Sequence, residues 1–256
     1  MRNITWSSSL VLGLLVIAGA SSALASETEQ ISRTLPLGAS GLVKIRNFSG
    51  HVTVTATEGH DVVVEAVRRG SRSQLDASHF EARAEGGAIV VEANARPAVR
   101  SWFSWGNHSL PDVDLDVKVP REARLDVSVF SSPIAVRGVA GDCRLHTFSA
   151  GVKAEDVTGA ITAHTFSGGV SIASRDEAGK AITVDTFSGN VDLRVPVTAR
   201  GTVQFRSFSG QFDSDRPVVV RERNRRTMTA ELGDATGASA RSDVHLKTFS
   251  GNVHIM

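Results

Sequence analysis

Serine is the residue type in this sequence that could most readily supply a nucleophile, because it follows phenylalanine at regularly spaced places. A catalytic serine needs a histidine base and an orienting acid. A serine that repeatedly precedes a small residue is instead typical of turns, where its hydroxyl bonds to nearby backbone. The sequence also has no Gly-x-Ser-x-Gly motif. We therefore predict turn serines and no catalytic residues.

Two histidines, His146 and His164, each lie two residues before a repeated phenylalanine. In adjacent coils of a repeat protein they would stack about 5 Å apart. Ser128 and Asp185 continue the same column, so a His/His/Asp metal site is one interpretation. The column also contains Arg46, Arg206 and Lys247. We therefore favour a solvent-exposed face and predict no metal and no cofactor.

Carboxylates that could cleave a glycosidic bond would have to be clustered. Asp192 and Asp213 both lie five residues after a repeated phenylalanine and are expected to be neighbours in that column. A pair of carboxylates on an exposed ladder is usually ordinary surface, so we predict that the protein is not an enzyme.

Two segments are candidates for binding. Trp102, Phe103 and Trp105 lie in a turn-rich stretch between Pro97 and Pro111, where they could stack on a sugar, dock a partner or cap the edge of the fold. Arg221, Arg223 and Arg225 alternate along an expected exposed hairpin and could contact an anionic surface. Solvated arginines that discourage edge pairing explain the second segment equally well.

Charge and cysteine content exclude several classes of protein. The chain has 28 Lys and Arg against 27 Asp and Glu, so it lacks the basic excess of a nucleic-acid binder. Its one cysteine, Cys143, can form neither an intramolecular disulfide nor a four-thiolate zinc site. The sequence has 11 Phe but no Tyr, an imbalance that needs a structural cause.

Residues 1–25 have the pattern of an export signal. Arg2 precedes an apolar stretch, Leu10–Ala20, and small residues end at Ala25. The apolar stretch is shorter than the ~20 residues that span a bilayer. We expect cleavage after Ala25, no stable membrane anchor afterwards, and a periplasmic or secreted protein.

A repeat accounts for the phenylalanine content. Seven of the 11 phenylalanines precede serine and a small residue: Phe48, Phe130, Phe148, Phe166, Phe187, Phe208 and Phe249. From Phe130 the intervals are 18, 18, 21, 21 and 41 residues, and the last is interpreted as two coils with a degraded middle copy. Apolar residues alternate with period two on both sides of the motif, which predicts two short strands per coil with a corner between them.

The expected fold is all-β: a single-stranded parallel β-helix or β-solenoid with 18–21-residue coils, right-handed. Residues 26–256 form one domain, with a looser strand-rich part over 27–121 and regular repeats over 122–256. A single coil buries too little apolar surface to be stable alone, so the coils must stack. We expect Cys143 in the core, and we favour corner phenylalanines that point inward, since an exposed row would be a large apolar patch. The alternative is that the strand continues unbroken and the phenylalanines point outward, in which case the stripe is a binding surface.

Several segments resemble a family of exported bacterial adhesin-like proteins, the domain-of-unknown-function 4097 type. Gly41–Val54 (GLVKIRNFSGHVTV) is similar to its first strand, Ser-Gly, strand unit, and Asp112–Pro120 to its central strand that ends in proline. Thr-Phe-Ser-Gly-Asn-Val at 186–191 and 248–253 matches the repeated unit, so the resemblance covers roughly residues 30–256. It implies a β-solenoid in the bacterial envelope and brings no catalytic residues.

We therefore expect an exported, non-enzymatic structural or interaction protein of the cell envelope, adhesin-like, whose partner is an envelope protein or a surface glycan. One alternative is a carbohydrate-binding or carbohydrate-active β-helix protein, which should show convergent acids or a cation site. A second alternative, suggested by the resemblance, is an accessory protein in envelope-stress sensing.

Overall fold

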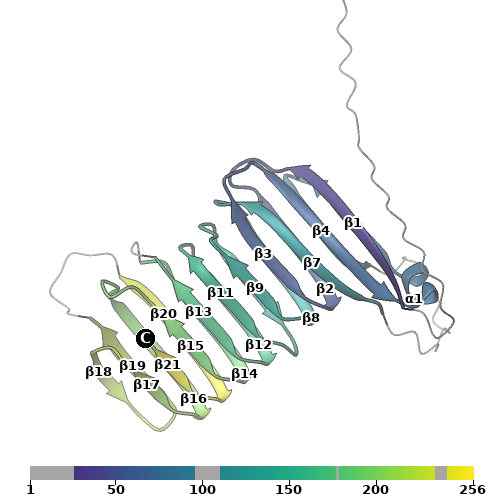
Figure 1. Cartoon of the computed structure of the whole chain (residues 1–256). Coiled ribbons are helices and arrows are strands. Elements are labelled where there is room, and N and C mark those ends of the chain that lie inside the picture. The colour runs from purple at the N-terminus through teal and green to yellow at the C-terminus, as the bar shows by residue number, and fades with distance from the viewer. Residues whose placement is uncertain (1–25, 96–109, 177–178, 234–240) are drawn as a thin grey trace, which may run out of the picture.

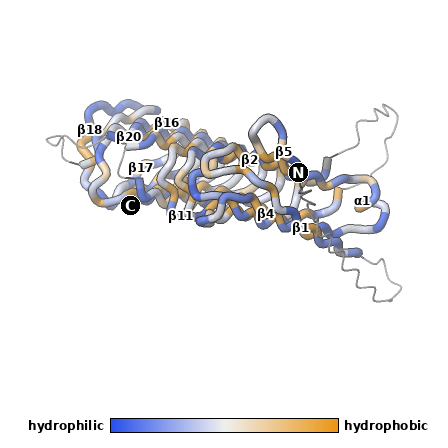
Figure 2. Tube along the Cα trace, turned by 90° about the horizontal axis from the view of Figure 1, so that it is seen from above, coloured by the Kyte–Doolittle hydropathy of each residue, from blue (hydrophilic) through white to orange (hydrophobic). Residues whose placement is uncertain are grey.

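The computed structural model describes residues 26–95, 110–176, 179–233 and 241–256. The expected signal segment 1–25 and the aromatic residues Trp102, Phe103 and Trp105 lie outside these described residues. The described strands form two sheets of ten and eleven strands. The molecule is elongated, with the helix α1 (Arg72–Ala77) near one end and the strand β18 (Val218–Arg223) at the other (Figure 2).

The two sheets contain the strands in an order that differs from their order in the chain. The ten-stranded sheet, the first sheet here, consists in spatial order of β1 (Glu27–Pro36), β4 (Asp61–Gly70), β7 (Asp112–Pro120), β3 (Val52–Thr57), β9 (Ile134–Arg137), β11 (Val152–Val157), β13 (Val170–Ser174), β15 (Val191–Arg194), β21 (Val253–Ile255) and β17 (Phe212–Ser214). The eleven-stranded sheet, the second sheet, consists of β18 (Val218–Arg223), β19 (Thr227–Leu232), β16 (Gly201–Ser209), β20 (Ser242–Ser250), β14 (Ile182–Ser188), β12 (Ile161–Ser167), β10 (Cys143–Thr147), β8 (Arg124–Ser131), β2 (Leu42–Ser49), β6 (Ala88–Ala95) and β5 (His79–Glu85).

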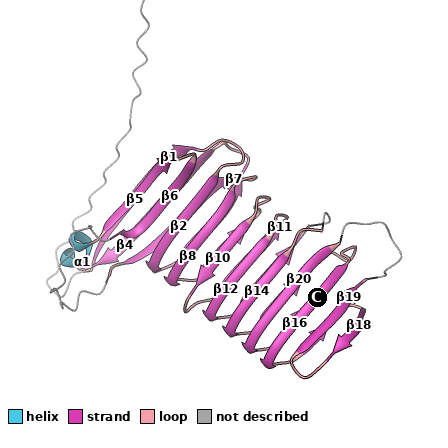
Figure 3. Cartoon of the chain, turned by 180° about the vertical axis from the view of Figure 1, so that it is seen from behind, coloured by secondary structure: helices cyan, strands magenta, loops and turns pink. Residues whose placement is uncertain are grey.

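Each coil adds one strand to each sheet, as the two opposite views show (Figures 1 and 3). In the middle of the stack the neighbouring pairs are parallel: Cys143 of β10 pairs with Leu125 of β8 on one side and Ile161 of β12 on the other. The pairs are in register except at the end of β11, where the pairing with β13 shifts between Glu155 and Val157. Equivalent residues of successive coils are therefore direct neighbours, as the alignment of the repeats predicts.

The core lies between the sheets and consists of the inward-facing residues of both. Val127, Leu145 and Val184 of the second sheet and Val136 and Leu193 of the first sheet are examples of these buried side chains. They alternate with exposed residues because successive side chains of a strand point to opposite faces. The two apolar columns expected on each side of the corner are confirmed.

The expectation of a wholly parallel, single-stranded helix is wrong at both ends of the stack, where the sheets are mixed. At one end β1, β4 and β7 are antiparallel, as are β5 and β6. At the other end the hairpin β18–β19 adds antiparallel to β16. β5–β6 and β18–β19 are hairpins, and strands joined by a short turn can pair only antiparallel. β1, β4 and β7 are separated in the chain by other strands, so their antiparallel pairing is long-range. The right-handed winding stays a prediction.

The spatial order of the coils also departs from the chain order. The last coil, β20 and β21, lies between β14–β15 and β16–β17, so Val244 pairs with both Ile182 and Val203. The 41-residue interval before Phe249 therefore holds the β18–β19 hairpin and a return connection, and its interpretation as two coils with a degraded copy is wrong.

Close approach between coils requires glycine at the corner. A Cβ atom added to Gly168 would lie 2.0 Å from the carbonyl oxygen of Ala150 in the neighbouring coil, whereas one added to Gly169 would be 3.6 Å from its nearest neighbour, the oxygen of Asn190. The first distance forces backbone to move, and the second is an ordinary contact.

We predict that Gly168→Ala lowers the free energy of unfolding by about 1–3 kcal/mol through overpacking, while Gly169→Ala changes it by less than about 1 kcal/mol. Urea unfolding followed by circular dichroism measures both. Equal losses for the two variants would contradict the close-approach explanation.

Candidate functional site

The most prominent surface feature is a ladder formed by the seven corner phenylalanines. Their side chains point outward from the second sheet and are between 43% and 55% exposed. The expectation that they point inward is therefore wrong. In spatial order the ladder runs Phe48, Phe130, Phe148, Phe166, Phe187, Phe249 and Phe208.

The reason is that the strand continues through the motif before the chain bends. The residue preceding each phenylalanine is buried: Asn47, Val129, Thr147, Thr165, Thr186, Thr248 and Ser207. The period-two alternation then places the phenylalanine on the outer face. The chain bends only after the phenylalanine, at the Ser-Gly pair, for example at Gly168. For the ring to point inward, the bend would have to come before the phenylalanine.

The rings of the ladder stack face to face along the axis of the stack. Neighbouring ring centroids are 4.7–5.0 Å apart and the ring planes differ by at most 6°. The spacing is that of hydrogen-bonded strands, so the backbone register imposes it. Because the ring faces contact each other, the ladder presents mainly ring edges to a partner.

An arginine closes the ladder at the end formed by Phe208. The guanidinium carbon of Arg226 lies 4.7 Å from the centroid of the Phe208 ring, a cation–π contact. The β18–β19 turn positions Arg226 there. The sequence gives no sign of this contact, because Phe208 becomes the end of the ladder only through the spatial order of the coils.

A hollow of about 420 Å³ runs beside the middle of the ladder. Phe148, Phe166 and Phe187 line it on one side, and His146, His164 and Asp185 line it on the other. The two imidazole rings are stacked 4.8 Å apart, which confirms the predicted juxtaposition of His146 and His164. The side of the hollow formed by the two histidines and Asp185 is therefore polar, and the side formed by the phenylalanines is aromatic.

The positions of the side chains do not favour the His/His/Asp metal interpretation, because among the described residues His146, His164 and Asp185 are not a group whose potential ligand atoms all approach one another closely. Burial, and then the neighbouring His164, lower the pKa of His146, so this ring favours its neutral form. Asp185 is engaged elsewhere, since its Oδ2 accepts a hydrogen bond of 3.0 Å from Nζ of Lys247. The column of His146, His164 and Asp185 therefore forms a polar border along the ladder. This agrees with the favoured sequence interpretation, in which the column lies on a solvent-exposed face.

The arginine segment is a hairpin, as expected, but its arginines do not form one regular face. A bulge between Val220 and Glu222 interrupts the alternation of β18, and Arg225 lies beyond the strand end. Nη2 of Arg221 donates to Oε2 of Glu231 at 2.6 Å. A binding role for Arg221, Arg223 and Arg225 stays a prediction.

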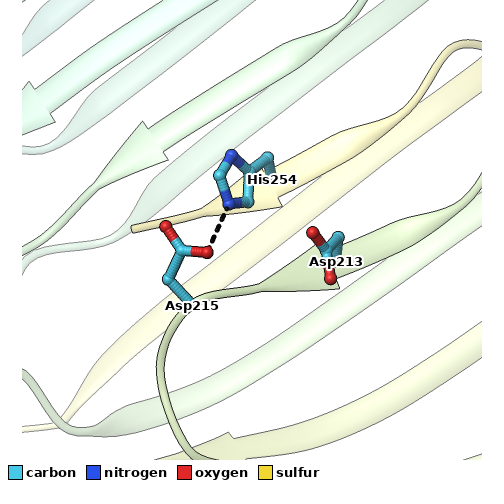
Figure 4. Close-up of side chains that lie close together, drawn as sticks. All are labelled: Asp213, Asp215 and His254. Atoms are coloured by element: carbon cyan, nitrogen blue, oxygen red, sulfur yellow. Dashed lines mark ion pairs between the residues drawn. The ribbon is translucent and has the colours of Figure 1, made fainter.

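Sequence reasoning missed a cluster of Asp213, Asp215 and His254 on the outer face of the first sheet (Figure 4). Asp192 and Asp213 were expected to be neighbours, but His254 of β21 pairs with both of their positions and separates them. Nε2 of His254 lies 3.1 Å from Oδ1 of Asp215.

Among the described residues, these three side chains are the group whose potential ligand atoms approach closely enough for a metal ion, all within 4.8 Å of one another. Both aspartates are exposed, and the carboxylates raise the pKa of His254, with Asp215 as the largest cause. The arrangement is explained as a surface ion pair, so no metal is assigned to it.

Cys143 is 1% exposed, and burial, followed by the nearby Asp142, raises the pKa of its thiol to about 12. A thiol at that pKa is an unreactive part of the core. The predicted core position is confirmed.

The fold and the surface together define a repeat-built, two-sheet β protein whose side chains form ladders along the stack. The chain belongs to the Toastrack DUF4097 family, whose model matches residues 126–256. The predicted resemblance is confirmed. None of the curated proteins matches the chain.

Solved structures of similar fold share little sequence with this chain. A "putative cell adhesion protein" from Clostridium sporogenes has a TM-score of 0.54 and 8% identity over 90% of this chain and 99% of that chain. A "putative adhesin" from Bacteroides fragilis has a TM-score of 0.30 and 12% identity, covering 89% and 97% of the two chains. The first likeness supports the fold.

In the part of the chain that the structure describes, no helix is long and apolar enough to cross a membrane.

The buried threonines behind the ladder provide a matched pair. Oγ1 of Thr165 donates to the carbonyl oxygen of Ala150 at 3.1 Å, whereas Oγ1 of Thr186 has no hydrogen-bond partner among the described residues. We predict that Thr165→Val lowers the free energy of unfolding by about 0.5–1.5 kcal/mol and that Thr186→Val leaves it unchanged or raises it. Denaturant titration tests this, and an equal loss in both variants would refute it.

The His254 cluster predicts a local pH effect. A free histidine has a pKa of about 6.5, and the hydrogen bond with Asp215 raises the pKa of His254 above that value. Its ion pair therefore contributes stability that is complete below 6.5 and is lost as the pH rises through the folded pKa. NMR titration should show that Asp215→Asn lowers the pKa of His254, while the distant Asp116→Asn does not. An unchanged pKa in the Asp215 variant would exclude the ion pair as the cause.

Proposed function

We propose that this chain is an exported, non-enzymatic interaction protein of the bacterial cell envelope, adhesin-like in function, that binds a partner through the phenylalanine ladder. The observation that carries the proposal is the row of seven exposed rings. Export is supported by the signal pattern of residues 1–25. The bacterial envelope setting is supported by the family resemblance.

The size of the ladder supports a binding role. A phenylalanine side chain has roughly 200 Å² of surface, so seven rings exposed by slightly less than half present roughly 650 Å² in one stripe. That is slightly above the roughly 600 Å² at the upper end of what a monomeric protein normally exposes, and larger patches mark interaction sites. Covering one such ring contributes about 2 kcal/mol.

The orientation of the rings supports an apolar partner over a carbohydrate. Sugars bind aromatic residues by stacking on ring faces, and the faces within the ladder are covered by neighbouring rings. Ring edges suit aliphatic and aromatic side chains. The described surface of the second sheet thus favours a protein partner over a surface glycan at this stripe.

A non-enzymatic role is supported by the way the titratable groups are arranged. The Asp213, Asp215 and His254 cluster lies on the first sheet, away from the repeated serines. His146 and His164 lie beside the ladder, but within the described part of the chain none of the repeated serines hydrogen-bonds to a histidine, and Ser49 donates to the carbonyl oxygen of Pro111 instead. A nucleophile and its base would have to be within hydrogen-bonding distance.

We predict that the triple variant Phe148→Ser/Phe166→Ser/Phe187→Ser binds envelope fractions at least about 100-fold more weakly than the unmodified chain, because three rings lose about 2 kcal/mol each. The measurement is a pull-down titration with washed envelope fractions of the source bacterium. Circular dichroism verifies that the variant is folded.

The matched control is Val219→Ser/Val220→Ser, which removes two other exposed apolar side chains from β18. Its binding should be unchanged. A second control, Phe→Leu at the same three ladder positions, should retain most binding because it retains apolar surface. If the serine variant is folded and binds normally, the ladder is not the binding surface.

A further inference from the structure

We propose that the ladder binds a second copy of this chain, forming a two-fold dimer whose stacks run parallel and in register. The inference rests on the proposed function, since it names the partner of the same stripe. Four properties of the described surface support it: its shape, its repeat, its area and its charges.

The shape of the surface is self-complementary. The rings form a ridge, and the hollow beside Phe148, Phe166 and Phe187 forms a groove parallel to it. A two-fold axis that runs along the stack exchanges ridge and groove, so the ridge of each copy enters the groove of the other. Phe166 of one copy would then lie between Phe166 and His164 of the second copy.

The repeat of the surface favours an identical partner. The rungs are spaced by 4.7–5.0 Å along the entire ladder. A partner makes the same contact at every rung only if it has the same spacing, and a second copy in register has it by construction. A partner with a different repeat would fit at one or two rungs and lose contact at the others.

The area is that of a modest but specific dimer. With the rings of all seven rungs covered, roughly 650 Å² on each copy, the interface buries roughly 1,300 Å² before flanking side chains are counted, which is close to the lower limit for stable protein–protein interfaces. Dissociation at micromolar concentrations is therefore expected.

Charges favour the parallel arrangement over the reversed one. The column two residues before the ladder has Arg46 at one end and Arg206 at the other, with Lys247 beside Arg206. Reversing one copy would place Arg46 opposite Arg206. In the parallel arrangement the column of one copy and the column of the other lie on opposite sides of the paired ladders. Each cation then lies beside phenylalanine rings of the other copy, much as Arg226 lies over Phe208 within one copy.

Sedimentation equilibrium of the purified chain from 1 to 200 μM tests self-association, with these concentrations chosen to be of the order expected for such an interface. We expect a reversible dimer of twice the chain mass. Phe148→Ser/Phe166→Ser/Phe187→Ser should raise the dissociation constant at least about 100-fold, and Val219→Ser/Val220→Ser should leave it unchanged. A chain that stays monomeric throughout, or a dimer that the folded ladder variant retains, overturns the proposal.

Cysteine crosslinking tests the arrangement. In the parallel dimer Phe48 lies next to Phe48 of the second copy, so Phe48→Cys should crosslink to itself with a short bis-maleimide. The buried Cys143 does not compete. If crosslinks form only in a mixture of Phe48→Cys with Phe208→Cys, the stacks are reversed and the proposed arrangement is wrong.

The two proposals fail separately. A monomeric chain whose ladder variant loses binding to envelope fractions refutes the dimer and leaves the proposed function standing. A dimer that the ladder variant abolishes without any change in envelope binding confirms self-association and refutes the ladder as the envelope-binding surface.

Discussion

In-register parallel pairing between neighbouring coils is the constraint on which the rest of this structure depends. It places equivalent residues of successive coils at the distance of adjacent strands. A residue type that recurs in the sequence repeat therefore forms a row of neighbouring side chains along the stack. The phenylalanine ladder, the stacked pair His146 and His164 and the close approach at Gly168 all follow from that one pairing. Cys143 is buried because its column is a core column.

The same constraint determines what kind of surface the protein can offer. Side chains are arranged in rows along the stack, so a binding surface takes the form of a stripe with a fixed repeat. Groups that converge on a point, as in an active site, arise where the repeat is broken. Asp213, Asp215 and His254 illustrate this, because they meet where the last coil has entered between two earlier ones.

A parallel stack leaves its terminal strands without partners, and exposed strand edges promote aggregation. Antiparallel strands cover part of each end. β18 and β19 cover β16, and β4 and β1 cover β7, while the short strand β17 stays the edge of the first sheet. Arg226 belongs to the first of these hairpins, so the element that covers the sheet also covers the last ring of the ladder.

Features of the fold that depend on local pattern could be predicted without the structure. The Phe-Ser repeat predicted the coils, the period-two alternation predicted two strands per coil and their buried columns, and the alignment of copies predicted that His146 and His164 are neighbours. These features could be read from the sequence because they depend on strand geometry and on spacing within a coil.

The tertiary structure alone decided where the chain bends, which coils are neighbours and how the ends are covered. Phe166 points outward because the strand continues past Thr165 to the corner at Gly168, and a shift of one residue reverses the face of a side chain. Phe249 stacks between Phe187 and Phe208 because its coil pairs with partners distant in the chain. Such pairings are selected by the free energy of the whole stack, which no local pattern in the sequence records.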